Sequence, residues 1–314
     1  MTPGPGPAGP KTGMAAVVVN YNAAGHLTGC LRSIAESGIS EAVVVDNNST
    51  DDSRAIVDTE DAVWLPAGSN LGYGRAANLG AQSPVAKSAE YLLICNPDVE
   101  IFPGAVEKLV EVLENDPSVG LVGPAITNPD GTLYPSARTF PDMVDAIGHG
   151  LLGLVAPRNR FTRRYRLLDW DHRELAKVDW VSGACFVVRH TAWDSVGGFD
   201  PDYFMYMEDV DLCWRIGRAG WDVAYEPAAK VLHVQGVSAD RHPYRMLAAH
   251  HRSLWRFAWR TTEGSRRVAL PAVGVGLLAR LAVAAALHRV GGPTASRTPP
   301  ASPPTGGAAP RPLP

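Results

Sequence analysis

The feature that most limits the fold is a regular alternation, over residues 14–123, of short apolar runs and segments with helical spacing. The apolar runs are rich in β-branched side chains and are not interrupted by polar positions. Such runs fit strands buried on both faces, as in a parallel sheet covered by helices on each side. We therefore expect an α/β fold with a mostly parallel central sheet flanked by helices, and ligands at the carboxyl ends of the strands. The expected strands are 15–19, 42–45, 62–65, 91–95 and 119–122, and the expected helices are 26–37, 51–57, 72–81 and 104–113.

Beyond residue 123 the pattern is less regular. A strand is expected at 178–188, interrupted by Ser182-Gly183-Ala184, and a helix is expected at 208–219. Two short closing strands, 223–225 and 230–233, and a helix over 243–260 follow. These segments complete one expected domain over residues 14–262, with a C-terminal helical extension.

Composition narrows the class of protein. The chain has 314 residues, 46% of them hydrophobic, which is enough for one large domain or two modest ones. The net charge of -3 carries no general signature of nucleic-acid binding. The four cysteines form no CxxC pair, which argues against a zinc site or a disulfide framework and fits a reducing cytoplasm. Residues 1–13 and 291–314 are rich in proline and are expected to be disordered.

An apolar stretch at 268–287 is long enough to span a bilayer, but Arg280 lies near its middle. Three interpretations stay open for a helix over 263–290. It spans the membrane, it lies on the membrane with its arginines meeting anionic head groups, or it packs on the domain. The role of an arginine cluster at 158–166 has two interpretations. The cluster binds an acceptor diphosphate or the bilayer surface, or it belongs to a solvated loop.

Polar residues follow the first two expected strands. No GxGxxG follows the first strand and no GxxxxGK[ST] occurs, which argues against a nicotinamide or flavin cofactor and against a P-loop kinase. Asn20 and Tyr21 are placed to line a base and ribose pocket, although a simple turn explains them equally. Asp46, at the end of the second strand, can accept the imide N–H of uracil or thymine.

A glycine-rich turn opens the expected helix at 72–81. Asn70 and Gly72 allow the backbone to approach a ligand at the helix N-terminus, where a phosphate is favoured. Arg75 supplies positive charge for a diphosphate. Alone, this turn is a weak signal; after the strand that ends in Asp46 it carries more weight.

Carboxylates occur at two distant points in the chain. Asn96-Pro97-Asp98 follows the strand at 91–95, and Glu208-Asp209 opens a helix. Asp98 is placed to hold a divalent cation on a diphosphate, and a second carboxylate can remove a proton from an acceptor hydroxyl. Together they indicate group transfer from a nucleotide-activated donor. The plain alternative is a solvated acidic helix start, since carboxylates favour helix N-termini.

In this order the motifs resemble those of family 2 glycosyltransferases. The segments that carry the resemblance, within residues 14–233, are Val19-Asn20-Tyr21-Asn22, Val45-Asp46-Asn47-Asn48-Ser49-Thr50-Asp51, Asn70-Leu71-Gly72-Tyr73-Gly74, Asn96-Pro97-Asp98 and Glu208-Asp209-Val210-Asp211-Leu212. The resemblance implies a GT-A fold, a nucleotide-diphosphate sugar donor and inversion at the anomeric centre. Asn-Pro-Asp in place of Asp-x-Asp most resembles the bacterial rhamnosyltransferase branch. That branch includes an enzyme that adds rhamnose from dTDP-rhamnose to a polyprenyl-diphosphate-linked N-acetylglucosamine.

The resemblance also implies roles for single residues. Asp209 is the expected general base, and Glu208 orients the acceptor or Asp209. With asparagine at position 96, only Asp98 offers a charged oxygen to Mn2+ or Mg2+, and His233 is expected to complete the metal shell unless it is an ordinary strand-end histidine. Trp180 and Gly183 are expected to lie beneath the acceptor. Asp211 is expected to form an ion pair with Arg215.

These expectations combine into one functional prediction. The chain is an inverting glycosyltransferase that moves a sugar, L-rhamnose by resemblance, to a lipid-diphosphate-linked glycan at the inner face of the plasma membrane. Transfer of glucose, galactose or galactofuranose stays open. So do a nucleotide-sugar-binding regulator without turnover and a membrane-anchored scaffold.

Overall fold

The computed structural model describes residues 13–140, 160, 163, 167, 170–234 and 243–291. Its strands are β1 (Met14–Asn20), β2 (Ala42–Asp46), β3 (Val63–Pro66), β4 (Tyr91–Cys95), β5 (Val99–Ile101), β6 (Val119–Thr127), β7 (Leu133–Tyr134), β8 (Ala137–Arg138), β9 (Ala176–Val178), β10 (Trp180–Val181), β11 (Cys185–Arg189) and β12 (Asp222–His233). Its helices are α1 (Ala24–Glu36), α2 (Ser53–Val57), α3 (Tyr73–Ala81), α4 (Pro84–Lys87), α5 (Ala105–Asn115), α8 (His190–Val196), α9 (Glu208–Arg218), α10 (Pro243–Thr261), the 3-10 helix η1 (Gly264–Ala269) and α11 (Leu270–Gly291).

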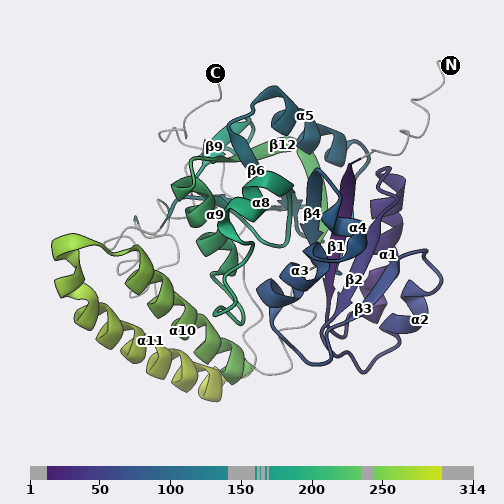
Figure 1. The fold of residues 1–314 in the computed structure, drawn as a ribbon. Coiled ribbons are helices and arrows are strands. Elements are labelled where there is room, and N and C mark those ends of the chain that lie inside the picture. The colour runs from purple at the N-terminus through teal and green to yellow at the C-terminus, as the bar shows by residue number, and fades with distance from the viewer. Residues whose placement is uncertain are drawn as a thin grey trace.

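A central sheet with the order β3-β2-β1-β4-β11-β6-β12-β5 runs through the molecule (Figure 1). The pairs β3-β2, β2-β1 and β1-β4 are parallel, as the alternating pattern predicts. The sheet as a whole is mixed, because β11 enters antiparallel between β4 and β6. This insertion brings the turn before β11 to the carboxyl end of β4, where the acidic motif begins.

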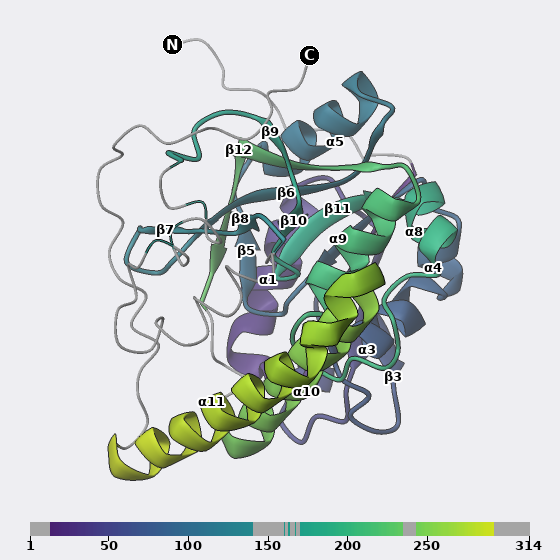
Figure 2. The same cartoon turned by 90° about the vertical axis from the view of Figure 1, so that its left-hand side faces the viewer.

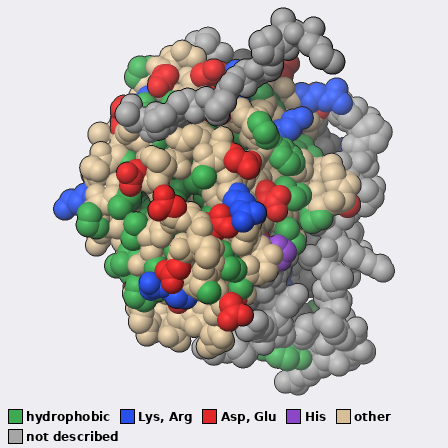
Figure 3. All heavy atoms as spheres, turned by 90° about the vertical axis from the view of Figure 1, so that its right-hand side faces the viewer, with side chains coloured by type: hydrophobic (Ala, Val, Ile, Leu, Met, Phe, Trp, Pro, Cys, Tyr) green, Lys and Arg blue, Asp and Glu red, His purple; other side chains and the backbone are tan. Residues whose placement is uncertain are grey.

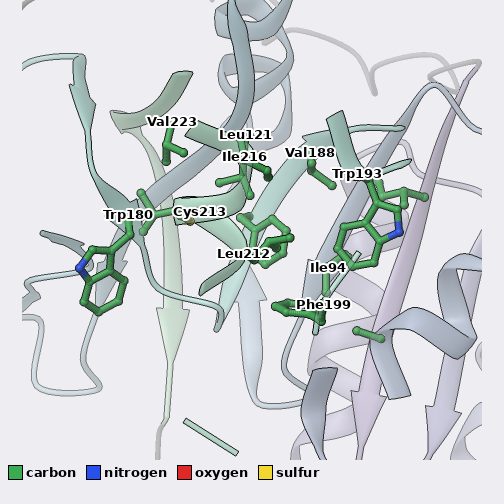
Figure 4. Packing of buried hydrophobic residues seen from close by; sticks show 14 of the residues in the cluster. Ile94, Leu121, Trp180, Val188, Trp193, Phe199, Leu212, Cys213, Ile216 and Val223 are labelled. Atoms are coloured by element: carbon green, nitrogen blue, oxygen red, sulfur yellow. The ribbon is translucent and has the colours of Figure 1, made fainter. Parts of the chain in front are cut away.

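Helices cover both faces of the sheet, and each face has its own apolar cluster. On one face residues of α1 and α5 share a cluster with alternate residues of β1, including Ala16 and Val18. On the other face residues of α3, α4, α8 and α9 share a cluster with the intervening residues, including Val17 and Val19. Figure 4 shows Leu212, Cys213 and Ile216 of α9 pointing into this second cluster, with Trp180 at one end and Phe199 near the other. Burial on both faces explains why the strands read as continuous apolar runs.

The two expected closing strands are one strand in the structure. β12 continues through residues 226–230 with a shift in register against β6 between Glu226 and Lys230. Its last residue, His233, lies opposite Val99 of β5. The irregularity therefore keeps the chain in the sheet and brings the strand end to the Asp98 loop.

The C-terminal helices form a hairpin beside the sheet domain. α11 follows α10 through η1 and lies along it, as Figures 1 and 2 both show. Phe257 of α10 is buried in the cluster that contains α9. α11 leaves apolar side chains uncovered, among them Val275 (68% exposed) and Leu278 (67% exposed). None of the described helices combines the length and apolarity that a bilayer crossing requires.

Charged side chains are interspersed on the face seen in Figure 3, where acidic and basic groups lie among each other over the coloured atoms. This arrangement agrees with the small net charge and offers no basic surface there for a nucleic acid. Residues 1–12 and 292–314, together with most of the arginine cluster at 158–166, lie outside the described residues.

Candidate active site

The acidic pair opens α9 on a left-handed turn. Tyr206 and Met207 have φ angles of 66° and 68°. The following residues, Glu208 and Asp209, occupy the first turn, where the helix dipole favours negative charge. Glu208 is buried and Asp209 is half-buried, which argues against a merely solvated helix start.

Asp209 is fixed by two backbone N–H groups. Its Oδ2 accepts a hydrogen bond of 2.9 Å from Gly183 N, and its Oδ1 accepts one of 2.9 Å from Val210 N. Glycine at position 183 leaves room for this side chain, because a Cβ there would lie 3.0 Å from Cβ of Asp209, which is a tight contact. The predicted acceptor residue Gly183 therefore also holds the predicted base.

Glu208 is held differently. Its side chain is buried, and its Oε2 has no hydrogen-bond partner among the described residues. Burial raises the pKa of Glu208 to about 8, and the charge of Asp209 adds to the rise. Burial raises the pKa of Asp209 as well, although the N–H groups of Gly183 and Val210 and the guanidinium of Arg138 oppose that rise. At neutral pH the negative charge of the pair therefore belongs on Asp209 and the proton on Glu208.

The Asn96-Pro97-Asp98 turn meets the histidine at the end of β12. Asp98 is buried, and its Oδ1 lies 3.2 Å from Nε2 of His233. Asn96 Nδ2 lies 3.1 Å from the same Nε2. Nδ1 of His233 is buried without a hydrogen-bond partner among the described residues.

These three side chains suit a divalent cation. A carboxylate, an imidazole and an amide converge on one point, and the opposite orientation of the Asn96 amide would present its oxygen there. The mixed set suits Mn2+ better than Mg2+, with substrate diphosphate and water as further ligands. The described residues contain no group of three or more His, Cys, Asp or Glu side chains that could hold a metal alone.

The two acidic elements meet at residues 183–184. Asn96 N donates a 2.9 Å hydrogen bond to Ala184 O, and the neighbouring Gly183 N binds Asp209. Gly183 O in turn accepts a 2.6 Å hydrogen bond from the Tyr73 hydroxyl at the start of α3. One turn thus contacts the Asn96-Pro97-Asp98 loop, the predicted base and the glycine-rich segment.

The predicted nucleotide pocket is ordered by its own hydrogen bonds. Asn20 Nδ2 donates to Asp46 Oδ1 (3.0 Å) and to Ser49 Oγ (3.1 Å), and Asp46 Oδ2 accepts from Ser49 N (3.0 Å). Asn20 Oδ1 is buried and has no partner among the described residues. Each oxygen of Asp46 keeps a second lone pair for an imide N–H.

The glycine-rich turn lies against the loop before α9. Asn70 Oδ1 accepts a 3.0 Å hydrogen bond from Gly72 N. Gly72 has a φ of 83°, and a Cβ there would lie 2.1 Å from Phe204 O. Arg75 is exposed, and its Nε donates to Pro201 O. Arg75 therefore contacts the loop before α9 in this structure.

Trp180 is buried, and its Nε1 donates to Thr139 O at 3.0 Å. The guanidinium of Arg138 lies 4.9 Å from the centre of its ring. The expected ion pair of Asp211 and Arg215 is confirmed at 2.6 Å.

Three residues of the site were not assigned a role from the sequence. Tyr73 and Asn47 lie within the motifs that carry the family resemblance, and this position is the sequence signal that could have identified them. In the structure, Asn47 Oδ1 accepts a 3.1 Å hydrogen bond from Leu71 N and so holds the glycine-rich turn. Arg138 lies in an irregular segment and carried no sequence signal.

Known proteins are similar to this chain in sequence and in fold. The family model described as glycosyl transferase family 2 matches residues 15–190. An N-acetylglucosaminyl-diphospho-decaprenol L-rhamnosyltransferase of Mycobacterium tuberculosis is 41% identical over 254 residues, which cover 77% of this chain and 82% of the relative.

The solved structures agree on the fold. The mannosyltransferase PcManGT from Pyrobaculum calidifontis, in complex with GDP-Man and Mn2+, superposes with a TM-score of 0.55 at 18% identity, covering 91% of this chain and 78% of its own. TarS residues 1–349 of S. aureus, in complex with UDP, give a TM-score of 0.54 at 14% identity, covering 89% and 72%. The fold is thus that of the GT-A glycosyltransferases, and the chain belongs to glycosyltransferase family 2.

Proposed function

We propose that the protein transfers L-rhamnose, with inversion, from dTDP-L-rhamnose to a hydroxyl of a polyprenyl-diphosphate-linked N-acetylglucosamine in cell-wall or polysaccharide assembly. The sequence relative supports the sugar and the acceptor, since its name gives L-rhamnose and a decaprenol-diphosphate-linked N-acetylglucosamine and it is matched over most of its length. The observation that carries the chemistry is the turn at residues 183–184, which contacts both the Asp98 loop and Asp209.

The donor binds at the carboxyl ends of β1 and β2 in this proposal. Asp46 accepts the imide N–H of the thymine, and Asn20 and Tyr21 line the base and ribose. The turn at Asn70 and Gly72 receives the diphosphate at the start of α3. Arg75 reaches the diphosphate by giving up its hydrogen bond to Pro201 O.

Asp98, His233 and Asn96 would hold a divalent cation, Mn2+ or Mg2+, beside the diphosphate. When bound, the cation neutralises the negative charge that develops on the leaving nucleotide. The protein orients the two side chains for this role, because Oδ1 of Asp98 already lies beside Nε2 of His233 at the end of β12.

In the transfer step an acceptor hydroxyl attacks the anomeric carbon from the face opposite the nucleotide. The new bond joins the acceptor oxygen to this carbon, and the bond from the carbon to the diphosphate oxygen breaks. Asp209 receives the hydroxyl proton, and dTDP leaves with the electron pair. Glu208, holding its proton at neutral pH, is placed to donate a hydrogen bond to an acceptor oxygen. Trp180 and Gly183 form the floor beneath the acceptor sugar.

We further propose that α11 rests on the inner face of the plasma membrane. Its uncovered residues Val275 and Leu278 would enter the head-group region, and Arg266 and Arg267 in the preceding η1 would meet anionic lipids. A surface-bound enzyme would meet the polyprenyl acceptor where its lipid chain is anchored.

The experiment is a transfer assay with a panel of dTDP-, UDP- and GDP-sugars, with and without Mn2+, using vesicles that carry the lipid-linked acceptor. Release of dTDP and a rhamnosylated lipid from dTDP-rhamnose alone would support the proposal. Turnover with a UDP-hexose instead would replace rhamnose by glucose, galactose or galactofuranose. Donor binding without any transfer would indicate a nucleotide-sugar-binding regulator.

A further inference from the structure

The loop that precedes the catalytic pair is strained. Gly197 and Gly198, at its start, have φ angles of 71° and 69°, as glycine allows. Tyr206 and Met207, at its end, have the same left-handed backbone without being glycine. Such residues cost about 1–2 kcal/mol each and persist only where their surroundings hold them. What holds this loop therefore also decides where Glu208 and Asp209 lie.

The sheet domain holds the loop at three points, one of them the hydrogen bond from Arg75 Nε to Pro201 O. Asn78 of α3 makes two hydrogen bonds to the backbone of Phe199, of 2.8 and 2.9 Å. Phe204 O accepts a 3.2 Å hydrogen bond from Tyr73 N. These contacts fix the beginning and middle of the loop but do not reach the strained residues at its end.

Helix α10 holds the end of the loop. Ser253 Oγ donates a 3.1 Å hydrogen bond to Met205 O. The ring of His250 packs edge-on against that of Tyr206, with centroids 5.2 Å apart. Of the two non-glycine residues with left-handed backbone, Tyr206 is thus supported directly from α10, while Met207 is buried in the apolar cluster that contains α9.

Two arginines on the same face of α10 form ion pairs with the loop, and the second of them also contacts α9. Arg256 lies 2.6 Å from Asp202 and 3.1 Å from Asp200. Arg260, one turn further, pairs with Asp200 and lies 3.2 Å from Oδ1 of Asp211 on α9. The Asp211 side chain is 0% exposed and that of Asp200 10%. Ion pairs with buried carboxylates lose far more when one partner is removed than exposed pairs do.

We propose that Arg260 is a positioning residue for the proposed transfer reaction, and that α10 acts as a brace for the catalytic pair. Arg260 closes the segment from Asp200 to Asp211, so that the first turn of α9 has one position relative to Gly183. The inference rests on the proposed role of Asp209. It extends the catalytic apparatus to a helix outside the 15–190 segment that matches the family model.

The test compares Arg260→Gln with Arg260→Lys and with Arg252→Gln, whose arginine is exposed on the same helix. Activity is measured well below the Tm of each variant, so that unfolding does not contribute to any decrease in kcat. Arg260→Gln should lower kcat by about 10- to 100-fold, the range expected for a small misplacement of a catalytic group. KM for the nucleotide sugar should change by less than about twofold, Lys should restore most of kcat, and Arg252→Gln should match the wild type.

Two further variants keep the proposal testable if Arg260→Gln folds poorly. Ser253→Ala removes one hydrogen bond and leaves no buried charge, and it should lower kcat about threefold without changing KM. In an Asp209→Asn background, Arg260→Gln should cause no further loss, because a positioning residue acts through the group it positions.

Wild-type kcat in both Arg260→Gln and Ser253→Ala would overturn the proposal, as would full additivity with Asp209→Asn. The proposed function would stand in those cases. Failure of the wild type to transfer sugar would instead contradict the proposed function, and the wild-type assay alone would show this.

Discussion

The buried, unpaired carboxyl of Glu208 should make the protein less stable as the pH rises. Its pKa is 4.5 in an ordinary environment and about 8 in the folded protein. Between these values the folded state holds the proton that the unfolded chain has released, so folding is favoured at low pH and the advantage is lost as pH rises towards 8. Glu208→Gln keeps the shape and a neutral side chain but removes the titration.

The size of the effect follows from the pKa difference. A pKa difference of one corresponds to about 1.4 kcal/mol, so the variant should gain about 1.4 kcal/mol over the wild type for each pH step of one between pH 5 and 8. The total gain across that range is about 4 kcal/mol, and above pH 8 it levels off. This is a large part of the 5–15 kcal/mol that stabilises a typical protein.

The assay is urea unfolding of the wild type and of Glu208→Gln at intervals from pH 5 to pH 9, followed by tryptophan fluorescence. Glu114→Gln, which removes an exposed carboxylate from α5, is the matched control. The quantity compared is the difference in unfolding free energy between variant and wild type, which cancels the titration of groups that do not interact with Glu208. A difference that stays constant from pH 5 to pH 8, or that shrinks, would refute the placement of a protonated Glu208 in the pair.

Three other predictions test separate parts of the site. Gly72→Ala should destabilise the protein by about 2 kcal/mol or more and weaken donor binding, because its Cβ would meet Phe204 O and its φ is left-handed; in chemical unfolding, Gly25→Ala, where a Cβ meets nothing within 4 Å, should be neutral. Asp98→Asn should abolish the extra thermal stabilisation that Mn2+ adds to bound dTDP-rhamnose, without changing the metal-free Tm by more than about 2 °C; an unchanged Mn2+ effect would move the metal site elsewhere. Leu278→Glu should reduce sedimentation with anionic phosphatidylglycerol vesicles, whereas Val63→Glu, at an exposed site on β3, should not. Equal vesicle binding by both variants would contradict the proposal that α11 contacts the membrane.

The sequence pattern predicts the parts of the fold that depend on local periodicity. The runs before Asn20, Asp46 and Asn96 are strands because they are buried on both faces, and the polar residues lie where those strands end. Pairing of distant segments is different, because no local feature encodes it. The antiparallel entry of β11 beside β4 depends on how the whole sheet closes, and it is this entry that brings Gly183 to Asp209.

Side-chain contacts between residues far apart in the chain could not be predicted from the sequence either. Arg75 follows a glycine-rich turn, which suggests a phosphate contact, yet in the structure its Nε donates to the Pro201 carbonyl 126 residues away. Asp211 shows its i,i+4 partner Arg215 in the sequence, but its second partner, Arg260, lies on α10 and is seen only in three dimensions. Residues with local partners could be predicted; residues fixed by tertiary packing could not.

The most direct test of the account is the turnover of Asp209→Asn. Nitrogen in place of one carboxylate oxygen preserves the size of the side chain and leaves an acceptor for the Gly183 N–H, but it removes the base. With dTDP-rhamnose and the lipid-linked acceptor, kcat should fall by about 10²- to 10⁴-fold while the donor binds with unchanged affinity. Transfer within a few-fold of the wild-type rate, with donor binding intact, would contradict the assignment of Asp209 as the residue that removes the acceptor proton.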